Sequence, residues 1–442
     1  MLIPSQIILT YVRPSYWLSG LEVCWGIITG MFALVKNAQQ VYALRVLLGL
    51  CESSAWPGMM TLLMHWYTPS ELAKRMGFYH SCQAVGSMMS GALQVAIRSS
   101  MHGLHGMNTT PSGQGLARAV ADCEIQGMPG WRWLFVVNAI MTVVVGALGF
   151  VLLPDTPNNP NPRAFWFKEG HAQLAMERLE RHGKAEPKKM TWAAAKRAFS
   201  SWVIYFIPIL YIATVLETYG NNYFNLFLKS LKNPDGSPRW TTSEVNAIPI
   251  GGSAINVVFV WIWAILSDLF MTRWTLIVAQ AVIGLAVCIA MSVWTAHPTT
   301  TSLAVAYAAN FITFTAMGTA PLIFAWLADI LPHDPEARTL IVGVSIAGYY
   351  AISAWSQVLV WPATQAPYYK YAWQSAIAIG VLVIIMTCVL RYIDARYLEP
   401  KRELYMATVI ETVAKDDGEP AEEVVRDSVD RKVKSTATMP QV

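Results

Sequence analysis

The sequence predicts an all-α, polytopic membrane protein. Of its 442 residues, 54% are apolar and only 14% are charged, whereas a soluble domain carries roughly 25% charged residues. The apolar residues form ten long blocks, and each reaches the length of about 20 residues that a membrane-spanning helix needs. This composition excludes a disordered chain, a nucleic-acid binder with a basic surface and most soluble enzymes.

The predicted spans are preceded by one shorter apolar segment, Leu2 to Thr10. This segment is too short to cross a bilayer, and it lacks the basic start and small-residue cleavage site of a signal peptide. The ten predicted spans are 16–35, 41–63, 77–97, 131–153, 201–228, 244–266, 274–295, 301–327, 339–361 and 372–393.

Basic residues set the predicted orientation. Of the 32 Lys and Arg residues, 23 lie in one set of alternate connecting segments and 8 in the other, and such residues favour the cytoplasmic side. This places the linker 154–200 and the tail 394–442 in the cytoplasm, and we expect the membrane to be the plasma membrane. The tail is polar and mixed in charge, so we expect it to be mostly disordered. The sequon at Asn108, in a loop of the opposite set, predicts a glycan.

Two similar stretches, six spans apart, indicate an internal repeat. They contain, in order, Pro57, Pro69, Glu71 and Arg75, and Pro321, Pro332, Glu336 and Arg338. Repeats related by an axis along the membrane normal are typical of secondary transporters. A six-span repeat predicts an N-terminal bundle, 1–153, and a C-terminal bundle, 201–393, on either side of the linker. The N-terminal bundle has only four spans and the short segment, so we expect it to lack its first helix and most of its second.

Charged residues inside span 41–63 are the first candidates for a functional site, because ionisable groups in a bilayer are expensive and usually functional. Arg45 and Glu52 are seven residues apart, which places them on one helix face about 10 Å apart, too far for a direct salt bridge. Gly49 and Trp56 share that face. We interpret Arg45 as the anchor of an anion and Glu52 as the carrier of a proton. The alternative is an interhelical ion-pair network.

Span 201–228 carries a second polar stripe, within an arc of roughly 140°. Such a face must look into the bundle or into water. Its amides suit hydrogen bonding to a carboxylate or amide, and Glu217 is a second candidate for proton coupling. The alternative is that these groups make interhelical hydrogen bonds only. The stripe consists of Thr214, Glu217, Thr218, Asn221, Asn222 and Asn225.

A thinner stripe lies in span 77–97, where Gln83 is a candidate for substrate binding. His80 lies near the predicted cytoplasmic end, and we interpret it as a hydrated, structural histidine. Three pairs of small residues four apart predict close helix contacts: Gly26 with Gly30, Gly86 with Ser90, and Ser87 with Gly91.

The sequence contains no motif of an enzyme, a nucleotide site or a metal site. We therefore expect no catalytic residue, no cofactor and no metal, and no nucleic-acid partner. Transport without a nucleotide site would have to be driven by a gradient.

Several runs of residues are similar to those of one family. They are Leu44 to Glu52, Trp56-Pro57-Gly58, His65-Trp66-Tyr67, Glu71 to Arg75, Gly130 to Phe135, Pro154-Asp155-Thr156-Pro157 and Phe224 to Ser230. Together they resemble the fungal allantoate permease family, anion:cation symporters of the major facilitator superfamily. The resemblance covers the chain to about residue 400, and the Pro-Asp-Thr-Pro run is most similar to the branch of pantothenate and biotin permeases.

The resemblance implies a major facilitator fold of twelve spans in two six-helix bundles, proton symport and organic-anion substrates. In the distantly related vesicular glutamate and sialic acid transporters, an Arg and a Glu seven apart in the fourth helix serve substrate and proton coupling, and Arg45 and Glu52 match that spacing. The segment Ile3 to Gln6 is similar to the end of the family's second helix.

The resulting interpretation is a monomer that takes up a small organic anion with protons by alternating access. Pantothenate, biotin, nicotinate and allantoate are the candidate substrates. The candidate substrate-binding residues are Arg45, Trp56, Gln83, Asn221, Asn222 and Asn225, and those for proton coupling are Glu52 and Glu217. Two alternatives remain: efflux of a fungal secondary metabolite, and a truncated, non-transporting membrane protein or nutrient receptor. Because helices are expected to be missing, we expect a chain starting at Met1 to transport poorly or not at all.

Overall fold

The structure is a computed structural model that describes residues 1–104, 124–125, 128–182, 184–185, 189–369 and 371–400. This part of the chain is helical, except for two small antiparallel ribbons. One pairs β1 (Glu124–Ile125) with β2 (Met128–Pro129), and the other pairs β3 (Asp155–Thr156) with β4 (Asn159–Pro160). Within the described residues, nine helical segments are long and apolar enough to cross a membrane. The predicted class, an all-helical multi-pass membrane protein, is confirmed.

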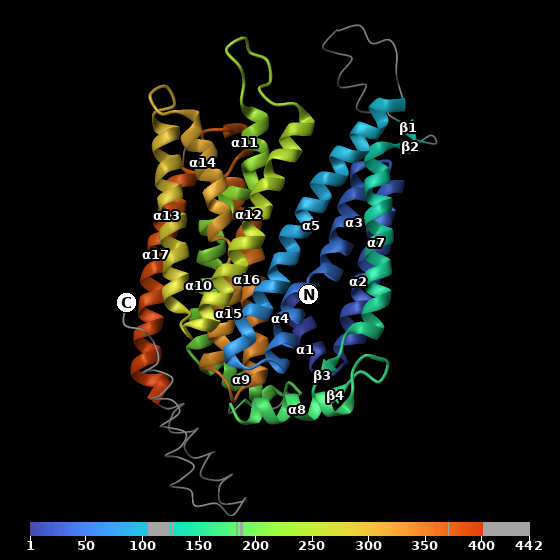
Figure 1. Ribbon diagram of the computed structural model, residues 1–442, viewed down its shortest axis with the longest axis vertical. Helices are drawn as coiled ribbons and strands as arrows, with labels where there is room; N and C mark the ends of the chain where they lie inside the picture. Colours follow the sequence, from blue (N-terminus) through green and yellow to red (C-terminus); the bar gives the residue numbers. More distant parts are fainter. Residues whose placement is uncertain (105–123, 126–127, 183, 186–188, 370, 401–442) are drawn as a thin grey trace, which may run out of the picture.

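The helices lie in two groups, with the linker helices across one end (Figure 1). We call that end the linker end. The first group contains α1 (Leu2–Leu9), α2 (Pro14–Met31), η1 (Phe32–Leu34), α3 (Ala38–Glu52), α4 (Ala55–Trp66), α5 (Pro69–Leu104) and α7 (Gly130–Leu152). The linker contains α8 (Glu169–Glu180) and α9 (Trp192–Ser200). The second group contains α10 (Val203–Glu217), η2 (Tyr219–Tyr223), α11 (Phe224–Ser230), α12 (Thr242–Leu269), α13 (Trp274–Ala296), α14 (Leu303–Thr313), η3 (Phe314–Ala316), α15 (Thr319–Ile330), α16 (Pro335–Val360), η4 (Ala363–Gln365), α17 (Ala372–Ile393) and η5 (Asp394–Leu398).

One predicted span differs from the rest in composition. The segment 77–97 lies inside α5, a helix of 36 residues that runs the height of the first group (Figure 1). It is not among the nine segments of the described chain that reach the hydropathy of a span, so the prediction that ten segments meet this criterion holds for nine of them. The cause is its polar residues, which include His80, Gln83 and Gln94. Over the length of α5, contact with α12 of the second group is extensive.

The internal repeat is visible as one interrupted helix used twice. Segment 38–66 breaks between α3 and α4, and segment 303–330 breaks between η3 and α15. After the break, α4 and α15 have the same length, 12 residues, and Pro57 and Pro321 each occupy the third position. The second proline of the repeat differs from the predicted pairing: Pro69 begins α5 and Pro335, rather than Pro332, begins α16.

The predicted tail begins later than residue 394. Residues Asp394–Leu398 continue α17 as a π-helical turn, and Asp394 is buried, accepting a hydrogen bond from Trp326 Nε1 at 2.9 Å. The first residues of that tail are therefore ordered against α15. Residues 401–442, whose disorder was expected, and the sequon at Asn108 lie outside the described residues.

Close packing of α2 on α7 depends on glycine, as the pairs of small residues predicted. A Cβ atom on Gly26 would lie 2.7 Å from a methyl group of Val143, and one on Gly30 would lie 3.3 Å from Ala139. Gly91 likewise lies against α12, close to Ile250. Nothing lies within 4 Å of a Cβ atom on Gly86, so the expected contact at that pair is not present among the described residues.

Replacing Gly26 with leucine should destabilise the protein by about 1–3 kcal/mol, because the new side chain overlaps Val143. Thermal unfolding of the purified protein in detergent measures the change. Gly20→Leu on the same helix is the matched control, since a Cβ atom there meets nothing within 4 Å. Equal unfolding temperatures for Gly26→Leu and Gly20→Leu would contradict the packing argument.

Candidate functional site

The charged residues of α3 are accessible rather than enclosed. Arg45 and Glu52 are both exposed, and the Arg45 guanidinium lies over the ring of Phe32, 5.5 Å from its centroid. Neither residue forms a salt bridge within the described part of the chain, so they do not neutralise each other. Gly49 lies between them, and nothing lies within 4 Å of a Cβ atom placed on it. None of the residues of α3 is buried, whereas most residues of the corresponding segment 303–330 are buried.

The helix is interrupted between Glu52 and Trp56, at Ser53 and Ser54. The predicted stripe of Arg45, Gly49, Glu52 and Trp56 therefore extends over two helices, α3 and α4. Trp56 is half-buried and packs against aromatic residues of the second group, with ring centroids 6.4 Å from Tyr211 and 5.6 Å from Phe324. Trp56 thus belongs to a contact between the two groups.

His80 joins the two groups, and its interpretation as a hydrated histidine near the helix end is wrong. Its Nε2 atom lies 3.2 Å from the carbonyl oxygen of Met317, and its ring meets that of Trp56 edge-on. Met317 lies in the break between η3 and α15. Two further side chains bond the same break: Trp263 Nε1 donates to the Thr315 carbonyl at 2.6 Å, and Gln280 Oε1 accepts from the Gly318 amide at 2.9 Å.

The polar stripe predicted on span 201–228 is divided by a second helix break. The helix stops at Glu217 and continues as the 3-10 segment η2, so the six residues do not share one face. Glu217 is buried and its carboxyl group lies between Gly284 and Gly380 of α13 and α17. Asn222 and Asn225 are exposed. The prediction assumed a regular α-helix through this span, whereas the residues around Gly220 form a 3-10 segment.

The remaining predicted residues occupy separate positions. Asn221 is half-buried, and its Nδ2 atom donates to Met317 Sδ at 3.4 Å. Thr214 is buried and donates to the carbonyl of Leu210, within its own helix. Gln83 is exposed on α5. Of the predicted substrate-binding residues, therefore, Trp56 and Asn221 approach the contact between the groups, while Arg45, Gln83, Asn222 and Asn225 are exposed.

One residue of the second group approaches the charged face of α3. The Tyr350 hydroxyl, on α16, lies within electrostatic reach of the Glu52 carboxyl and of the Tyr219 hydroxyl. Tyr219 in turn lies close to Asn222 and Gln357. The electrostatic interaction between Glu52 and Tyr350 therefore links the first group of helices with the second.

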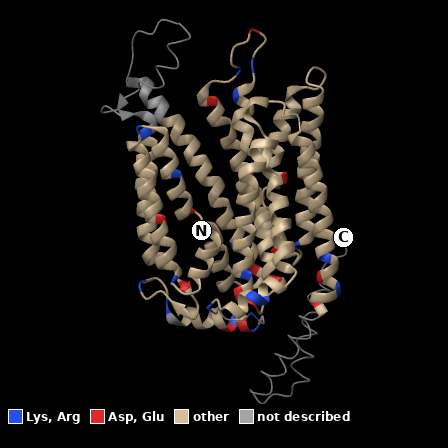
Figure 2. Ribbon diagram, turned by 180° about the vertical axis from the view of Figure 1, so that it is seen from behind, with Lys and Arg blue, Asp and Glu red and all other residues tan. Residues whose placement is uncertain are grey.

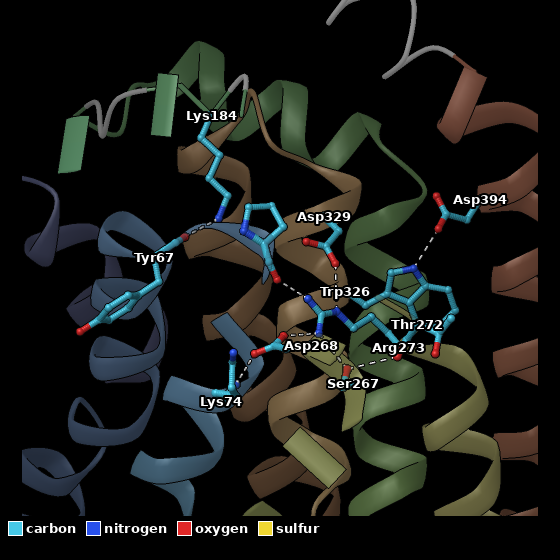
Figure 3. A network of polar contacts seen from close by, with 11 residues as sticks. Tyr67, Lys74, Lys184, Ser267, Asp268, Thr272, Arg273, Trp326, Asp329 and Asp394 are labelled. Carbon is cyan, nitrogen blue, oxygen red and sulfur yellow. Dashed lines mark hydrogen bonds and ion pairs between the residues drawn. The ribbon is translucent and has the colours of Figure 1, made fainter. Parts of the chain in front are cut away.

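A buried ionic network closes the linker end (Figure 3). Arg273 is 4% exposed. Its guanidinium donates to Asp268 at 2.6 Å, to Asp329 at 3.1 Å and to Ser267 at 2.8 Å, and also to the carbonyl oxygen of Pro69 in the first group. Composition and spacing did not single out these residues, because Asp329 and Pro69 lie far along the chain from Arg273 and Asp268.

The same network ties the start of α5 to the second group. Asp268 accepts a hydrogen bond from the backbone amide of Lys74 at 2.8 Å. The start of α5 is therefore bonded twice to the end of α12 and the connection that follows it: the Lys74 amide bonds to Asp268, and the Pro69 carbonyl bonds to Arg273. Figure 2 shows that charged residues gather at the linker end, whereas few interrupt the helices.

The linker bonds to both groups. Lys184 is buried, and its Nζ atom donates to the carbonyl of Tyr67 at 2.9 Å, while the next amide, that of Ala185, donates to the carbonyl of Pro332 at 3.2 Å. Burial, then the nearby Arg338, lowers the pKa of Lys184 to about 7. Farther along, Arg197 pairs with Asp334 at 2.7 Å.

The Pro-Asp-Thr-Pro run has a structural role in this arrangement. Asp155 is buried and accepts hydrogen bonds from the amide and hydroxyl of Ser15, at 2.6 and 3.0 Å, at the start of α2. Its backbone adopts a positive φ of 60°, and its carbonyl accepts from Trp66 Nε1 at 2.6 Å. Burial raises the pKa of the Asp155 carboxyl, which the bonds from Ser15 oppose. This run therefore fixes the start of the linker to α2 and α4.

Comparison with known proteins identifies the family. The model of the Major Facilitator Superfamily matches residues 11–233. The chain belongs to the major facilitator superfamily. Members of this superfamily are transporters rather than enzymes, in agreement with the absence of an enzyme motif from the sequence.

Three fungal transporters are among the curated relatives of this major facilitator chain. It is 30% identical to the MFS transporter PfmaC of Pestalotiopsis fici, over 87% of this chain and 66% of that protein. It is 26% identical to the pantothenate transporter liz1 of Schizosaccharomyces pombe, over 91% of this chain and 72% of that protein. It is 22% identical to the vitamin H transporter of Saccharomyces cerevisiae, over 89% and 60%. The chain thus spans less than two thirds of the length of PfmaC and of the vitamin H transporter.

Solved structures show the same fold. The proton:xylose symporter XylE of E. coli matches with a TM-score of 0.64 at 14% identity, over 90% of this chain and 83% of that one. The fucose:proton symporter FucP of E. coli matches with a TM-score of 0.57 at 13% identity, over 88% and 86%. The major facilitator fold that the resemblance implied is therefore confirmed.

Replacing Arg273 with glutamine should lower the free energy of unfolding by about 3–5 kcal/mol, because it leaves the buried Asp268 without its counter-ion. Thermal unfolding in detergent is the measurement. Arg197→Gln removes an arginine from an exposed pair at the same end, so its expected cost is at most about 1 kcal/mol. A loss at Arg273 no larger than that at Arg197 would mean that the buried network does not hold this end together.

Proposed function

We propose that this protein is a secondary transporter that takes up a small organic anion together with protons. The linker end faces the cytoplasm of a plasma membrane in this proposal, as the distribution of Lys and Arg predicts. The observation that carries it is the pair Arg45 and Glu52: opposite charges on a membrane helix, exposed and without a salt-bridge partner among the described residues. The similarity to a pantothenate and a vitamin H transporter supports an organic anion as substrate.

The proposed mechanism is alternating access between the two groups of helices. In the arrangement described, Arg273, Asp268 and Pro69 hold the linker end closed, and Trp56 and His80 make the next contact toward the opposite end. Opening to the cytoplasm requires these contacts to separate. Binding of an anion at Arg45 supplies free energy that differs between the two states, which is what a ligand needs in order to shift such an equilibrium.

Glu52 is the better of the two candidates for proton coupling. It is exposed, and in this proposal it exchanges the proton with water in the path between the two groups of helices. The Glu217 carboxyl is instead buried between Gly284 of α13 and Gly380 of α17. We therefore assign the coupling proton to Glu52 and a structural position in the second group to Glu217.

Uptake of radiolabelled anions tests the proposal. Yeast cells expressing the protein are supplied with pantothenate, biotin, nicotinate and allantoate at acidic and neutral external pH, and binding of the same anions to purified protein is measured in parallel. Saturable uptake of one anion that rises at acidic pH is expected. Both this chain and any longer chain encoded by its gene are used, which tests the sequence-based expectation of poor transport separately. Neither uptake nor binding by either chain would overturn the proposal.

Arg45→Lys should weaken uptake and binding of the anion. Lysine keeps the charge but loses the planar fork that matches a carboxylate, and a hydrogen bond to a charged group contributes about 1.5–3 kcal/mol. A rise of about tenfold or more in KM, at normal surface expression, is the expected result. An unchanged KM would remove Arg45 from the site.

Glu52→Gln should abolish accumulation driven by a pH gradient while exchange of labelled for unlabelled anion continues. Glutamine keeps the shape of the side chain but cannot carry the proton. Glu217→Gln is the comparison variant, and it should still accumulate the anion. If Glu52→Gln concentrates the anion in proportion to the pH gradient, the assignment is wrong and Glu217 becomes the candidate.

A further inference from the structure

We propose that the second group of helices binds one sodium ion in a small cavity at the break between α10 and η2. The ligands are side-chain oxygen atoms of Glu217, Thr218, Asn221 and Thr313. This inference goes beyond the proposed function, because the site lies in a different group of helices from Arg45 and Glu52 and forms no part of the anion site.

The negative charge of the site belongs to Glu217, the last residue of α10. This residue is 3% exposed, and its Oε1 atom is buried without a hydrogen bond within the described part of the chain. Cβ atoms placed on Gly284 and Gly380 would lie 2.6 and 2.8 Å from that oxygen, so α13 and α17 approach the carboxyl group closely. An ionised carboxyl group in such surroundings is strongly unfavourable unless a positive charge accompanies it.

A cavity beside this carboxyl group has room for one small ion. Its lining includes Glu217, Thr218, Asn221 and Thr313, and no Lys, Arg or His is among the described residues that line it. The space open to the centre of a water molecule is about 10 Å³, which is room for one particle of that size. A bare sodium ion fits this space, whereas a hydrated ion or an organic cation is too large.

The polar side chains around the cavity offer lone pairs. Asn221 Oδ1 is buried and makes no hydrogen bond within the described residues. The Thr313 hydroxyl donates its hydrogen to the carbonyl of Ala309 at 3.0 Å, and the Thr218 hydroxyl donates to the carbonyl of Val215 at 3.5 Å. Both hydroxyl oxygens therefore keep their lone pairs for a ligand.

Trp373 also lines the cavity, and it is the side chain there with an N–H group. The carbon edge of its ring faces the break, because a Cβ atom placed on Gly220 would lie 2.8 Å from its Cη2 atom. The break is therefore bordered by oxygen atoms and by the apolar edge of this ring.

This excess of acceptors favours a cation over a water molecule. Water has two hydrogens for the four side-chain oxygens, whereas a cation can contact all of them. The end of α10 adds to the preference, since the last carbonyls of a helix lack partners within it and carry partial negative charge. Half-helix ends of this kind coordinate sodium ions in secondary transporters. Oxygen ligands suit a hard cation, and a single carboxylate matches a single positive charge.

The purified protein in detergent tests the site. Thermal unfolding is followed in NaCl and in choline chloride at equal ionic strength, and binding of radioactive sodium is measured at equilibrium. We expect Tm to rise with NaCl concentration to a plateau, and one sodium ion to bind per chain. Both effects should be lost in Glu217→Gln, because glutamine keeps the shape of the side chain but supplies no charge.

Thr313→Val removes one ligand oxygen and keeps the shape of the side chain, so Kd for sodium should rise about tenfold or more. Thr387→Val is the matched control. Thr387 is buried in α17 and its hydroxyl makes the same kind of bond, to the carbonyl of Val383 at 2.7 Å, but it is not among the residues that line the cavity. Its replacement should leave Kd unchanged.

Equal Tm values in NaCl and choline chloride, with no bound sodium, would overturn the inference. That result is expected if the cavity holds a water molecule or if Glu217 holds a proton. Sodium binding that persists in both Glu217→Gln and Thr313→Val overturns it too, because the ion then lies elsewhere. Thr313→Val, compared with Thr387→Val, decides the matter if Glu217→Gln does not fold. Each of these outcomes leaves the proposed function intact, since anion uptake tests that function separately.

Discussion

The constraint on which this structure depends is that backbone polar groups inside a membrane need partners within the protein. A regular helix supplies them, but three spanning segments are interrupted: 38–66, 203–230 and 303–330. At the last of these, side chains from three other helices bond the freed groups, namely His80, Trp263 and Gln280. Because His80 belongs to the other group of helices, the break is also where the two groups recognise each other.

The buried charge at the linker end likewise needs partners within the protein. Burial of Arg273 is tolerated because Asp268 and Asp329 neutralise it and because Ser267 and the Pro69 carbonyl use its remaining donors. A contact of this kind depends on geometry, so small displacements of α5 against α12 remove several bonds at once. Apolar packing alone would tolerate sliding more readily. A network that is either fully made or broken suits two groups of helices that must adopt two discrete arrangements.

The charged residues of the candidate site differ from those of the linker end in their exposure and in their pairing. Arg45 and Glu52 are exposed and form no salt bridge within the described residues. Glu52 is the last residue of α3, directly before the break that precedes α4. Charges that neutralise one another stabilise a structure, whereas charges left unneutralised are available to a ligand. The contrast between Arg273 and Arg45 therefore separates a structural arginine from a candidate binding arginine more clearly than their positions in the sequence do.

The sequence by itself determined the membrane class, nine of the ten spans, the repeat around Pro57 and Pro321 and the spacing of Arg45 and Glu52, because these depend on local hydropathy and on helix periodicity. Only the tertiary structure decided where the spans break, since a break depends on partners such as His80 and Gln280 that come from distant helices. It likewise divided the stripe from Thr214 to Asn225 and brought Arg273 to Asp268 and Pro69. Periodicity assumes an unbroken helix, and pairing between connections is a property of the packed molecule.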